Sequence, residues 1–364
     1  MKKTKLTIIA FAICSLFASC IQKEEPNSEA DIITCILPQE ILKADPLIEN
    51  ESIMIMVNKG TNLTAVAPQF TLTKGATIDP ASGTTRNFLS PQKYTVTSQD
   101  GEWTKEYVVS FVDADLSTQY HFEDTIKRVK YYIFAEKDEK TNKVIMEWAS
   151  GNGGFAITGA GKTDKDYPTI QSDRGLRGKC AELVTRSTGS FGSMVGMPIA
   201  AGNLFIGKFD VASALQNPLK ATKLGLPFSN VPTYLIGYYK YKAGEQYTEK
   251  GEVVPNKKDI CDIFAVFYET DESTPILDGT NKFTHPNVFS IARIVEPQES
   301  NDWIRFKLPF ITQPGKTINI EKLKAGKYNI AIIFSSSISG DKFYGAVGST
   351  LFIDEVELLY NTID

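Results

Sequence analysis

Aromatic and charged side chains alternate in one segment of this sequence in a way that could recognise a sugar. From Trp303 to Phe310 the even-numbered residues form an apolar row, so Trp303, Arg305 and Lys307 share the opposite face of the expected strand. An indole can stack on the C–H surface of a sugar ring while flanking charged groups hydrogen-bond its hydroxyls. Trp303 and Arg305 are therefore predicted to bind carbohydrate; the alternative is a half-buried tryptophan beneath a loop.

Two other segments could add aromatic or amide groups to such a site. Tyr239 and Tyr241 share one face of an expected strand, Tyr238 lies on the other, and only one face can point to a core. Trp148 ends another strand and precedes a glycine-rich loop, in which Asn152 can both donate and accept hydrogen bonds. Trp148, Asn152, Tyr239 and Tyr241 are predicted to take part in binding, although a structural turn beneath a core tryptophan would also explain the first two.

Cleavage of a glycosidic bond would instead need two carboxyl groups across a cleft, about 5 to 5.5 Å apart for retention and about 6.5 to 9.5 Å apart for inversion. The candidates are Glu147, Asp262 and Glu269. Asp262 interrupts an apolar row and Glu147 adjoins Trp148, so both could be shielded from water. Linear spacing cannot pair them, and partnership with a cation is the alternative. Enzymatic activity is left open, with binding favoured over catalysis.

One carboxylate lies among apolar residues near the end of the chain. By period-two alternation Asp354 shares a face with Phe352, Val356 and Leu358, so it needs a hydrogen-bond donor or a cation beside it. The segments that contain Glu123 and Asp354 resemble the paired terminal segments of carbohydrate-binding jelly rolls, which implies a shared structural calcium. Calcium takes about six to eight oxygens, so these two would be part of a site. No other cofactor is expected, and an ordinary hydrogen-bonded aspartate is the alternative.

Charge and composition exclude several classes of function. The chain has 39 basic and 43 acidic residues, a net charge of −4, which does not favour nucleic acid as a partner. Its two histidines lie far apart in the sequence, which excludes a histidine-rich zinc site. Cys35, Cys180 and Cys261 are too few for a disulfide framework and are predicted to be buried, with a bridge between the last two left open.

The N-terminus has the pattern of an exported lipoprotein. Lysines precede an apolar run from Leu6 to Phe17 that is too short to span a bilayer, and small residues precede Cys20. This resembles a bacterial lipobox, so residues 1–19 are predicted to be a signal peptide, Cys20 to carry lipid, and 20–30 to be a flexible tether. The segment Lys23 to Glu25 resembles the export tag of Bacteroidetes surface lipoproteins, which implies the outer membrane, facing the cell exterior.

The elements that must position these residues are short strands. Residues 31–114 alternate with period two between turn signals, which predicts an immunoglobulin-like β-sandwich that serves as a spacer. Residues 115–364 predict a larger jelly-roll β-sandwich with long loops and one short helix within 123–136. The fold class is thus all-β. The strands expected in the larger domain are 143–148, 203–209, 234–242, 260–269, 303–310, 328–334 and 351–360.

Several segments together resemble a known family. They are Trp148 to Asn152, Ala200 to Gly207, Gly237 to Tyr241, Asp259 to Ile263, Ser335 to Ser337 with Gly340 and Asp341, and Gly345 to Leu351. Over about residues 120–360 they resemble the "putative carbohydrate metabolism domain" family of Bacteroidetes lipoproteins, and the segments 75–83 and 94–101 resemble its N-terminal immunoglobulin-like modules. The resemblance implies a non-catalytic stalk followed by a jelly roll akin to carbohydrate-binding modules and glycoside hydrolases.

These patterns predict a surface lipoprotein that binds a glycan during polysaccharide uptake or metabolism. The expected partners are a glycan, the membrane through the lipid anchor only, and a surface protein complex in which the chain could take part. A glycoside hydrolase that uses a pair of carboxylates is the first alternative. A structural or adhesive surface protein without a sugar site is the second.

Overall fold

The computed structural model describes residues 26–42, 45–48, 50–58, 61–112, 116–138, 142 and 144–362. The predictions for the signal peptide, for lipidation of Cys20 and for most of the tether lie outside these residues, as does the predicted domain boundary at 114/115. The chain divides into two compact units, residues 1–55 with 60–111 and residues 56–59 with 112–364. Within the described residues, no helix has both the length and the apolar character needed to cross a membrane.

The smaller unit is built from antiparallel strands. Its five-stranded sheet has the order β2-β3-β7-β6-β5, and β1 pairs with β4. Alternate residues are buried along β3, β6 and β7, which confirms the period-two pattern. A 3₁₀ turn covers Gln39–Ile41. The strands are β1 Ile32–Ile36, β2 Leu47–Ile48, β3 Ser52–Met56, β4 Gln69–Leu72, β5 Thr77–Asp79, β6 Gln92–Thr97 and β7 Thr104–Val112.

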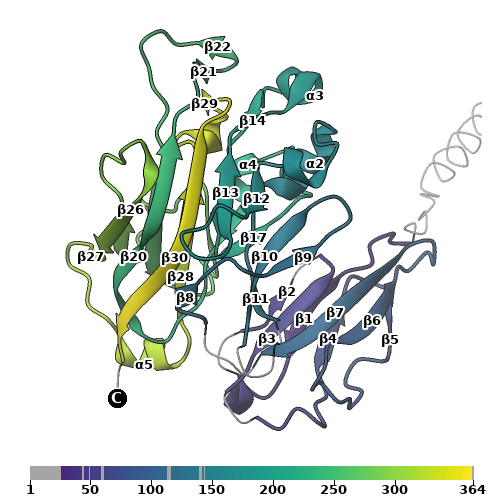
Figure 1. Cartoon of the computed structure of the whole chain (residues 1–364). Helices are drawn as coiled ribbons and strands as arrows, with labels where there is room; N and C mark the ends of the chain where they lie inside the picture. The colour runs from purple at the N-terminus through teal and green to yellow at the C-terminus, as the bar shows by residue number, and fades with distance from the viewer. Residues whose placement is uncertain are drawn as a thin grey trace, which may run out of the picture. The chain divides into compact units, whose positions relative to one another are not determined.

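The larger unit has two main antiparallel sheets, drawn in Figure 1 with β20 and β30 in front of β28. The front sheet has the order β12-β13-β30-β20-β26, and β8 also pairs with β30. Its strands are β8 Gln119–Tyr120, β12 Thr169–Ser172, β13 Cys180–Val184, β20 Val231–Lys242, β26 Ser300–Pro309 and β30 Thr350–Asn361. The all-β prediction with a larger jelly-roll sandwich is confirmed.

The back sheet has the order β16-β28-β23-β25-β27, and β19 pairs with β28. Every residue of β23 from Asp262 to Tyr268 is buried, so this strand shows no alternation and both faces of the sheet are covered there. Its strands are β16 Asn203–Phe205, β19 Leu226–Pro227, β23 Asp262–Glu269, β25 Val288–Arg293, β27 Ile311–Thr312 and β28 Tyr328–Ser335.

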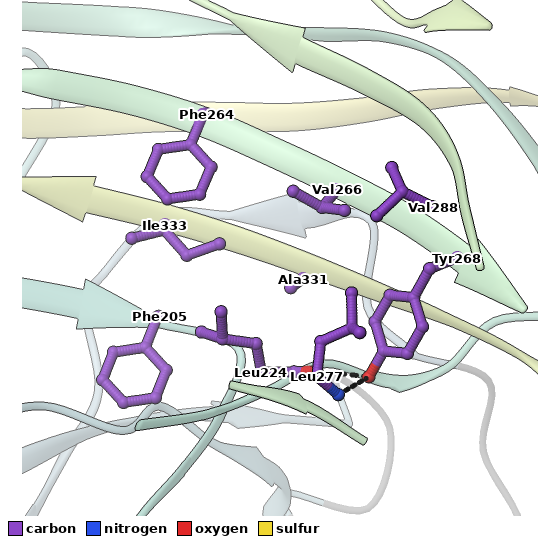
Figure 2. Close-up of a cluster of buried hydrophobic side chains, with 9 residues drawn as sticks. All are labelled: Phe205, Leu224, Phe264, Val266, Tyr268, Leu277, Val288, Ala331 and Ile333. Carbon is purple, nitrogen blue, oxygen red and sulfur yellow. Dashed lines mark hydrogen bonds between the residues drawn. The ribbon is translucent and has the colours of Figure 1, made fainter. Parts of the chain in front are cut away.

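A third layer covers one face of the back sheet. It is the sheet β17-β18-β24, formed by Gly207–Phe209, Thr222–Leu224 and Leu277–Asp278. Figure 2 shows the buried cluster that this layer shares with the back sheet, in which the Tyr268 hydroxyl donates to Leu224 O and accepts from Leu277 N. This face of the back sheet is therefore packed, whereas β20 and β26 of the front sheet carry partly or fully exposed side chains on their outer side.

Shorter elements complete the larger unit. The helix predicted within 123–136 is wrong, because that segment forms β9 and β10 of a three-stranded sheet with β11. The remaining elements are β9 Thr125–Lys127, β10 Tyr132–Lys137, β11 Val144–Glu147, α2 Asn152–Thr158, η3 Asp164–Asp166, β14 Arg186–Ser187, α3 Gly189–Met194, β15 Ile199–Ala200, α4 Pro218–Ala221, β21 Tyr247–Glu249, β22 Glu252–Val253, α5 Ile320–Lys324, η4 Gly340–Lys342 and β29 Gly345–Ala346.

Candidate functional site

The outer face of the front sheet carries a row of aromatic and charged side chains. Strand register places Lys240 of β20 opposite Phe352 of β30, and Phe352 opposite Glu182 of β13. Trp303 of β26 flanks Lys240 on the other side, and Arg174 from the loop before β13 reaches Phe352. We call these five residues the aromatic–cation row.

Contacts within the aromatic–cation row hold its rings and cations against one another. Lys240 Nζ lies 4.5 Å from the centroid of the Trp303 ring and 5.2 Å from that of Phe352. The Arg174 guanidinium lies 4.5 Å from the Phe352 centroid, and its Nη2 donates to Glu182 Oε1 at 2.9 Å. Cations over aromatic faces are attracted by the ring quadrupole. The row therefore presents ordered aromatic rings beside hydrogen-bonding groups.

Two of the predicted sugar-binding residues lie on this outer face. Trp303 is partly exposed, and Arg305 and Lys307 are exposed on the same side of β26. Register also puts Arg305 opposite Tyr238, which is partly exposed on β20. These positions satisfy the geometric requirement for stacking and hydrogen bonding, and the binding itself stays a prediction.

The prediction for Tyr239 and Tyr241 is wrong, because both side chains belong to the core. They are 2% and 1% exposed, and the Tyr239 hydroxyl accepts a hydrogen bond from Gln298 N at 3.0 Å. The opposite pair, Tyr238 and Lys240, faces outward. Alternation identified the two pairs, and the position of the back sheet decides which pair is buried.

The prediction for Trp148 and Asn152 is also wrong. Trp148 is 1% exposed and packs against Tyr120 and Phe122, with ring centroids 5.0 and 5.6 Å away. Asn152 is fully buried; it donates to Thr169 O at 2.7 Å and accepts from Thr169 N at 3.1 Å. Neither side chain can meet a ligand, so the structural alternative holds for both.

Each of the three predicted catalytic carboxylates has a cationic partner. Glu147 Oε2 is 2.6 Å from Arg128 Nη2, and Asp262 accepts two hydrogen bonds from Arg293 at 3.0 and 2.7 Å. Glu269 pairs with Lys322 and accepts from the Tyr328 hydroxyl. Asp262 and Glu269 begin and end the same strand, which at about 3.3 Å per residue separates them by roughly 23 Å. These two therefore cannot form the pair that a glycosidase needs.

Asp354 does not share a face with Val356 and Leu358, which corrects the sequence reading. The register of β30 against β20 shifts between Tyr238–Asp354 and Ile236–Glu357, and Glu355 at the shift has φ of 48°. This β-bulge adds one residue, so the Asp354 side chain points to the same side of the sheet as Phe352 and away from Val356 and Leu358. Asp354 is nevertheless fully buried there, because the loop with Leu176 and Arg177 packs against it.

Backbone N–H groups occupy the carboxylate oxygens of Asp354 and Glu123, the two residues predicted to share a calcium ion. Leu176 and Arg177 donate backbone N–H groups to Asp354 Oδ2 at 2.7 and 3.1 Å, Glu355 N donates to Oδ1 at 2.8 Å, and Lys179 N donates to Glu123 Oε1 at 2.9 Å. Burial raises the pKa of Asp354, and these N–H groups act against that shift. In the described part of the chain no cluster of three acidic, histidine or cysteine groups could hold a metal ion. The predicted calcium stays a prediction that a melt with and without chelator tests.

The segments that carry the family resemblance build a buried polar network at one end of the sandwich. Asp259 is 1% exposed, and its Oδ2 accepts from Ser337 Oγ at 2.6 Å, Ser349 Oγ at 2.7 Å and Ala346 N at 2.8 Å. Thr185 joins it through the hydroxyl of Ser337. Because these groups satisfy one another away from solvent, they position loops rather than a ligand.

A hollow of about 350 Å³ lies beside β8 and β10 and contains a carboxyl group that the sequence reading missed. Trp148 Nε1 donates to Glu136 Oε1 at 2.8 Å. Burial raises the pKa of Glu136 to about 7, while the Trp148 hydrogen bond and nearby His121 act against the shift. The segment was expected to be helical, so Glu136 was not placed beside Trp148.

The cysteines are buried, as predicted. Cys35 is 7% exposed, and Cys180 and Cys261 are fully buried. All three thiols are free, so the bridge left open between Cys180 and Cys261 does not form.

Comparison with known proteins assigns both units. Residues 121–359 match the family described as "Putative carbohydrate metabolism domain", and residues 32–111 match the family described as "SGBP, N-terminal", in which SGBP denotes a surface glycan-binding protein. No curated protein matches the chain.

Two solved structures, each described as a "putative glycoside hydrolase", are similar to this chain. The one from Bacteroides thetaiotaomicron VPI-5482 is 61% identical, with a TM-score of 0.85 over 94% of this chain and 100% of that chain. The one from Bacteroides vulgatus ATCC 8482 is 45% identical, with a TM-score of 0.64 over 68% of this chain and 99% of that chain. Since the first family covers more than half of the residues, this chain belongs to the "Putative carbohydrate metabolism domain" family.

Proposed function

We propose that this protein is a lipid-anchored surface protein that binds a glycan on the outer face of its front sheet. The observation that carries the proposal is the aromatic–cation row, with Trp303 and Phe352 on either side of Lys240. Its membership in a carbohydrate-related family and the match of residues 32–111 to an SGBP N-terminal unit support the proposal.

The spacing of the aromatic–cation row suits a sugar chain. Trp303 and Phe352 lie on β26 and β30, which flank β20, so two strand spacings of about 4.8 Å separate them. This is roughly the length of a disaccharide. The partly exposed Trp303 ring can stack on a pyranose C–H face. Phe352 holds Arg174 and Lys240 over its ring, and these two cations can donate to sugar hydroxyls.

The N-terminal sequence supports a location at the cell surface. The apolar run, the lipobox-like residues before Cys20 and the Lys23 to Glu25 tag favour export and anchoring to the outer membrane, facing outward. A lipid-anchored module with an exposed sugar-binding face would retain polysaccharide for uptake.

A glycan array followed by calorimetry tests the proposed binding. We expect the wild type to bind at least one polysaccharide, and Phe352→Ala and Lys240→Ala to weaken that binding because each removes part of the row. Lys93→Ala, at a lysine in the smaller unit that is 69% exposed, serves as the control and should bind normally. If the wild type binds no glycan at millimolar concentration, the proposal is contradicted. The remaining hypothesis is then a structural or adhesive surface protein without a sugar site.

Glycoside hydrolysis is a second candidate, favoured by one observation at Glu136. A carboxyl group whose pKa is about 7 retains a proton at neutral pH and could donate it to a glycosidic oxygen as that bond breaks. Asp124, which lines the same hollow and pairs with Lys137 at 2.5 Å, is the nearby carboxylate that could take the proton of the attacking water.

Release of reducing ends from a polysaccharide panel tests hydrolysis. If Glu136 is the acid, Glu136→Gln should abolish release, whereas Glu147→Gln should not, because Glu147 lies outside the lining of the hollow and is paired with Arg128. Activity that survives Glu136→Gln would exclude this site, and no release from any substrate would leave binding alone.

A further inference from the structure

The cations on the β20–β26 half of the outer face have no acidic partners. Lys240 contacts two aromatic rings, Lys307 Nζ lies 4.4 Å from the Tyr234 ring centroid, and Arg305 is exposed. Among the described residues, none of these three cations forms an ion pair with a carboxylate. This half of the face is therefore positive, although the whole chain carries a net charge of −4.

The acids on the neighbouring strands are mostly neutralised by local partners. Glu182 pairs with Arg174 at 2.9 Å, and backbone N–H groups surround Asp354. Glu355 pairs with His121 at 3.0 Å and with Arg177 at 3.7 Å. The acids of the β30–β13 half are therefore paired locally, and they do not neutralise the cations of the β20–β26 half.

Asp302, which precedes Trp303 on β26, is exposed and is one acid against the three cations of this half. Glu357 is a further acid among the described residues of this face. It lies on β30 opposite Ile236, and Ile236 lies opposite Lys307, so a whole strand separates Glu357 from the cations of β26. In the described part of the chain, Glu357 forms no ion pair with Arg305 or Lys307, although all three side chains lie on neighbouring rows of this face. Arg305 and Lys307 thus stay available to an anionic ligand.

The placement of Arg305 relative to Trp303 matches a sugar that carries a negative group. The two residues are neighbours on one side of β26, about 6.6 Å apart along the strand. A pyranose ring stacked on the indole would extend a carboxylate or sulfate toward the guanidinium, whose planar fork binds such oxyanions in bidentate fashion. Lys240 is already ordered by its two rings, so little further side-chain entropy is lost when it meets the same ligand.

We infer that the ligand of this face is an anionic polysaccharide, whose charge is carried by uronate carboxylates or by sulfate esters. The inference rests on the proposed glycan binding and adds the substrate class to it. Arg305 is the residue that sets this preference, with Lys240 and Lys307 in support.

Chemically matched pairs of polysaccharides test the inference. Polygalacturonate is compared with its carboxyl-reduced form, dextran sulfate with dextran, and a wider array of uronate-containing or sulfated glycans with their reduced or desulfated forms. We expect the charged member of at least one pair to bind ten times or more tightly than its neutral counterpart, and added salt to weaken that binding. A preference within the polygalacturonate pair would identify a carboxylate ligand, and a preference within the dextran sulfate pair would identify a sulfate ligand.

Variants separate specific recognition from general attraction to a polyanion. Arg305→Ala should lose most of the preference for the charged member, and Arg305→Lys should retain part of it. Trp303→Ala should also lose binding, whereas Lys93→Ala should behave as the wild type. A protein that binds glycans equally well after their charge is removed contradicts this inference and leaves the proposed function standing. A protein that binds none of the glycans contradicts both.

Discussion

Lys240 and its neighbour Tyr241 show how one residue step decides the role of a side chain. Tyr241 is 1% exposed in the core, while Lys240 lies between Trp303 and Phe352 on the outer face. The alternating sequence defines the two sets of residues on β20, but the choice of the buried set depends on where the back sheet packs. Trp303 and Arg305 were predicted correctly to lie outward because their strand has an unbroken apolar row on its other side.

The buried ion pair between Asp262 and Arg293 makes a prediction about stability. The Asp262 side chain is 6% exposed and Arg293 37% exposed. Arg293→Met leaves the carboxylate buried without a partner, so we expect a loss of about 3 kcal/mol in the free energy of unfolding, measured in urea.

The matched control for this ion pair is an exposed one. Arg128→Met breaks the pair with Glu147, whose side chains are 47% and 42% exposed, and should change stability by less than about 1 kcal/mol. Equal losses in the two variants would contradict the structural role assigned to Asp262.

Glu136 predicts a dependence of stability on pH. Its pKa is raised from 4.5 to about 7 in the folded protein, so between these values the folded state binds more protons than the unfolded state. Stability should therefore fall as pH rises through this range. Glu136→Gln stays neutral and keeps an oxygen for Trp148, so relative to the wild type it should gain about 1 to 3 kcal/mol between pH 4.5 and pH 7. Urea unfolding of both proteins at both pH values checks this. If the stability difference between the variant and the wild type is the same at pH 4.5 and pH 7, Glu136 is not desolvated.

At the scale of elements, β30 explains why part of the site could not be derived from the sequence. The predicted strand at 351–360 matches β30 Thr350–Asn361, yet the bulge at Glu355 reverses the faces of the residues on its two sides. The period-two pattern holds only for an uninterrupted strand. A positive φ is usually signalled by glycine, but the residue at this bulge is Glu355, so the sequence gives no sign of it. Asp354 and Phe352 were consequently placed on the same face as Val356 and Leu358, although the prediction that Asp354 needs a hydrogen-bond donor is confirmed.

The bulge predicts different effects of two substitutions at Glu355. Both Glu355→Asn and Glu355→Val remove the contacts with His121 and Arg177. Asparagine tolerates φ near 48°, whereas a β-branched residue there is strained. We expect the valine variant to be less stable than the asparagine variant by about 1 to 2 kcal/mol, measured by thermal or urea unfolding. Equal stability would mean that the strand can realign without the bulge.

At the scale of the whole molecule, the architecture could be predicted from the sequence, but the composition of the candidate binding site could not. Alternation and turn residues predicted the all-β fold and six of the larger unit's strands, while 203–209 divides into β16 and β17. The aromatic–cation row joins residues from β13, β20, β26, β30 and a loop, and only strand order brings them together. Arg174 and Phe352 were therefore missed, since neither has a distinctive sequence context.

The lipid anchor is also a prediction about the whole molecule. In a Bacteroidetes host, the wild type should label with radioactive fatty acid, remain in the membrane fraction and be cleaved by protease added to intact cells. Cys20→Ala should lose both the label and the membrane association, whereas Cys14→Ala should keep both. A Cys20→Ala protein that remains lipidated, or a wild type that is protected from the protease in intact cells, would contradict the proposed location.

The most direct test of glycan binding on the outer face compares two tryptophans by calorimetry. Trp303 lies in the aromatic–cation row, and Trp103 is an exposed tryptophan of the smaller unit, with 62% of its surface accessible. With the best polysaccharide from the array, Trp303→Ala should weaken binding about tenfold or more, while Trp103→Ala should bind as the wild type does. Wild-type affinity in the Trp303→Ala protein would contradict the assignment of the site.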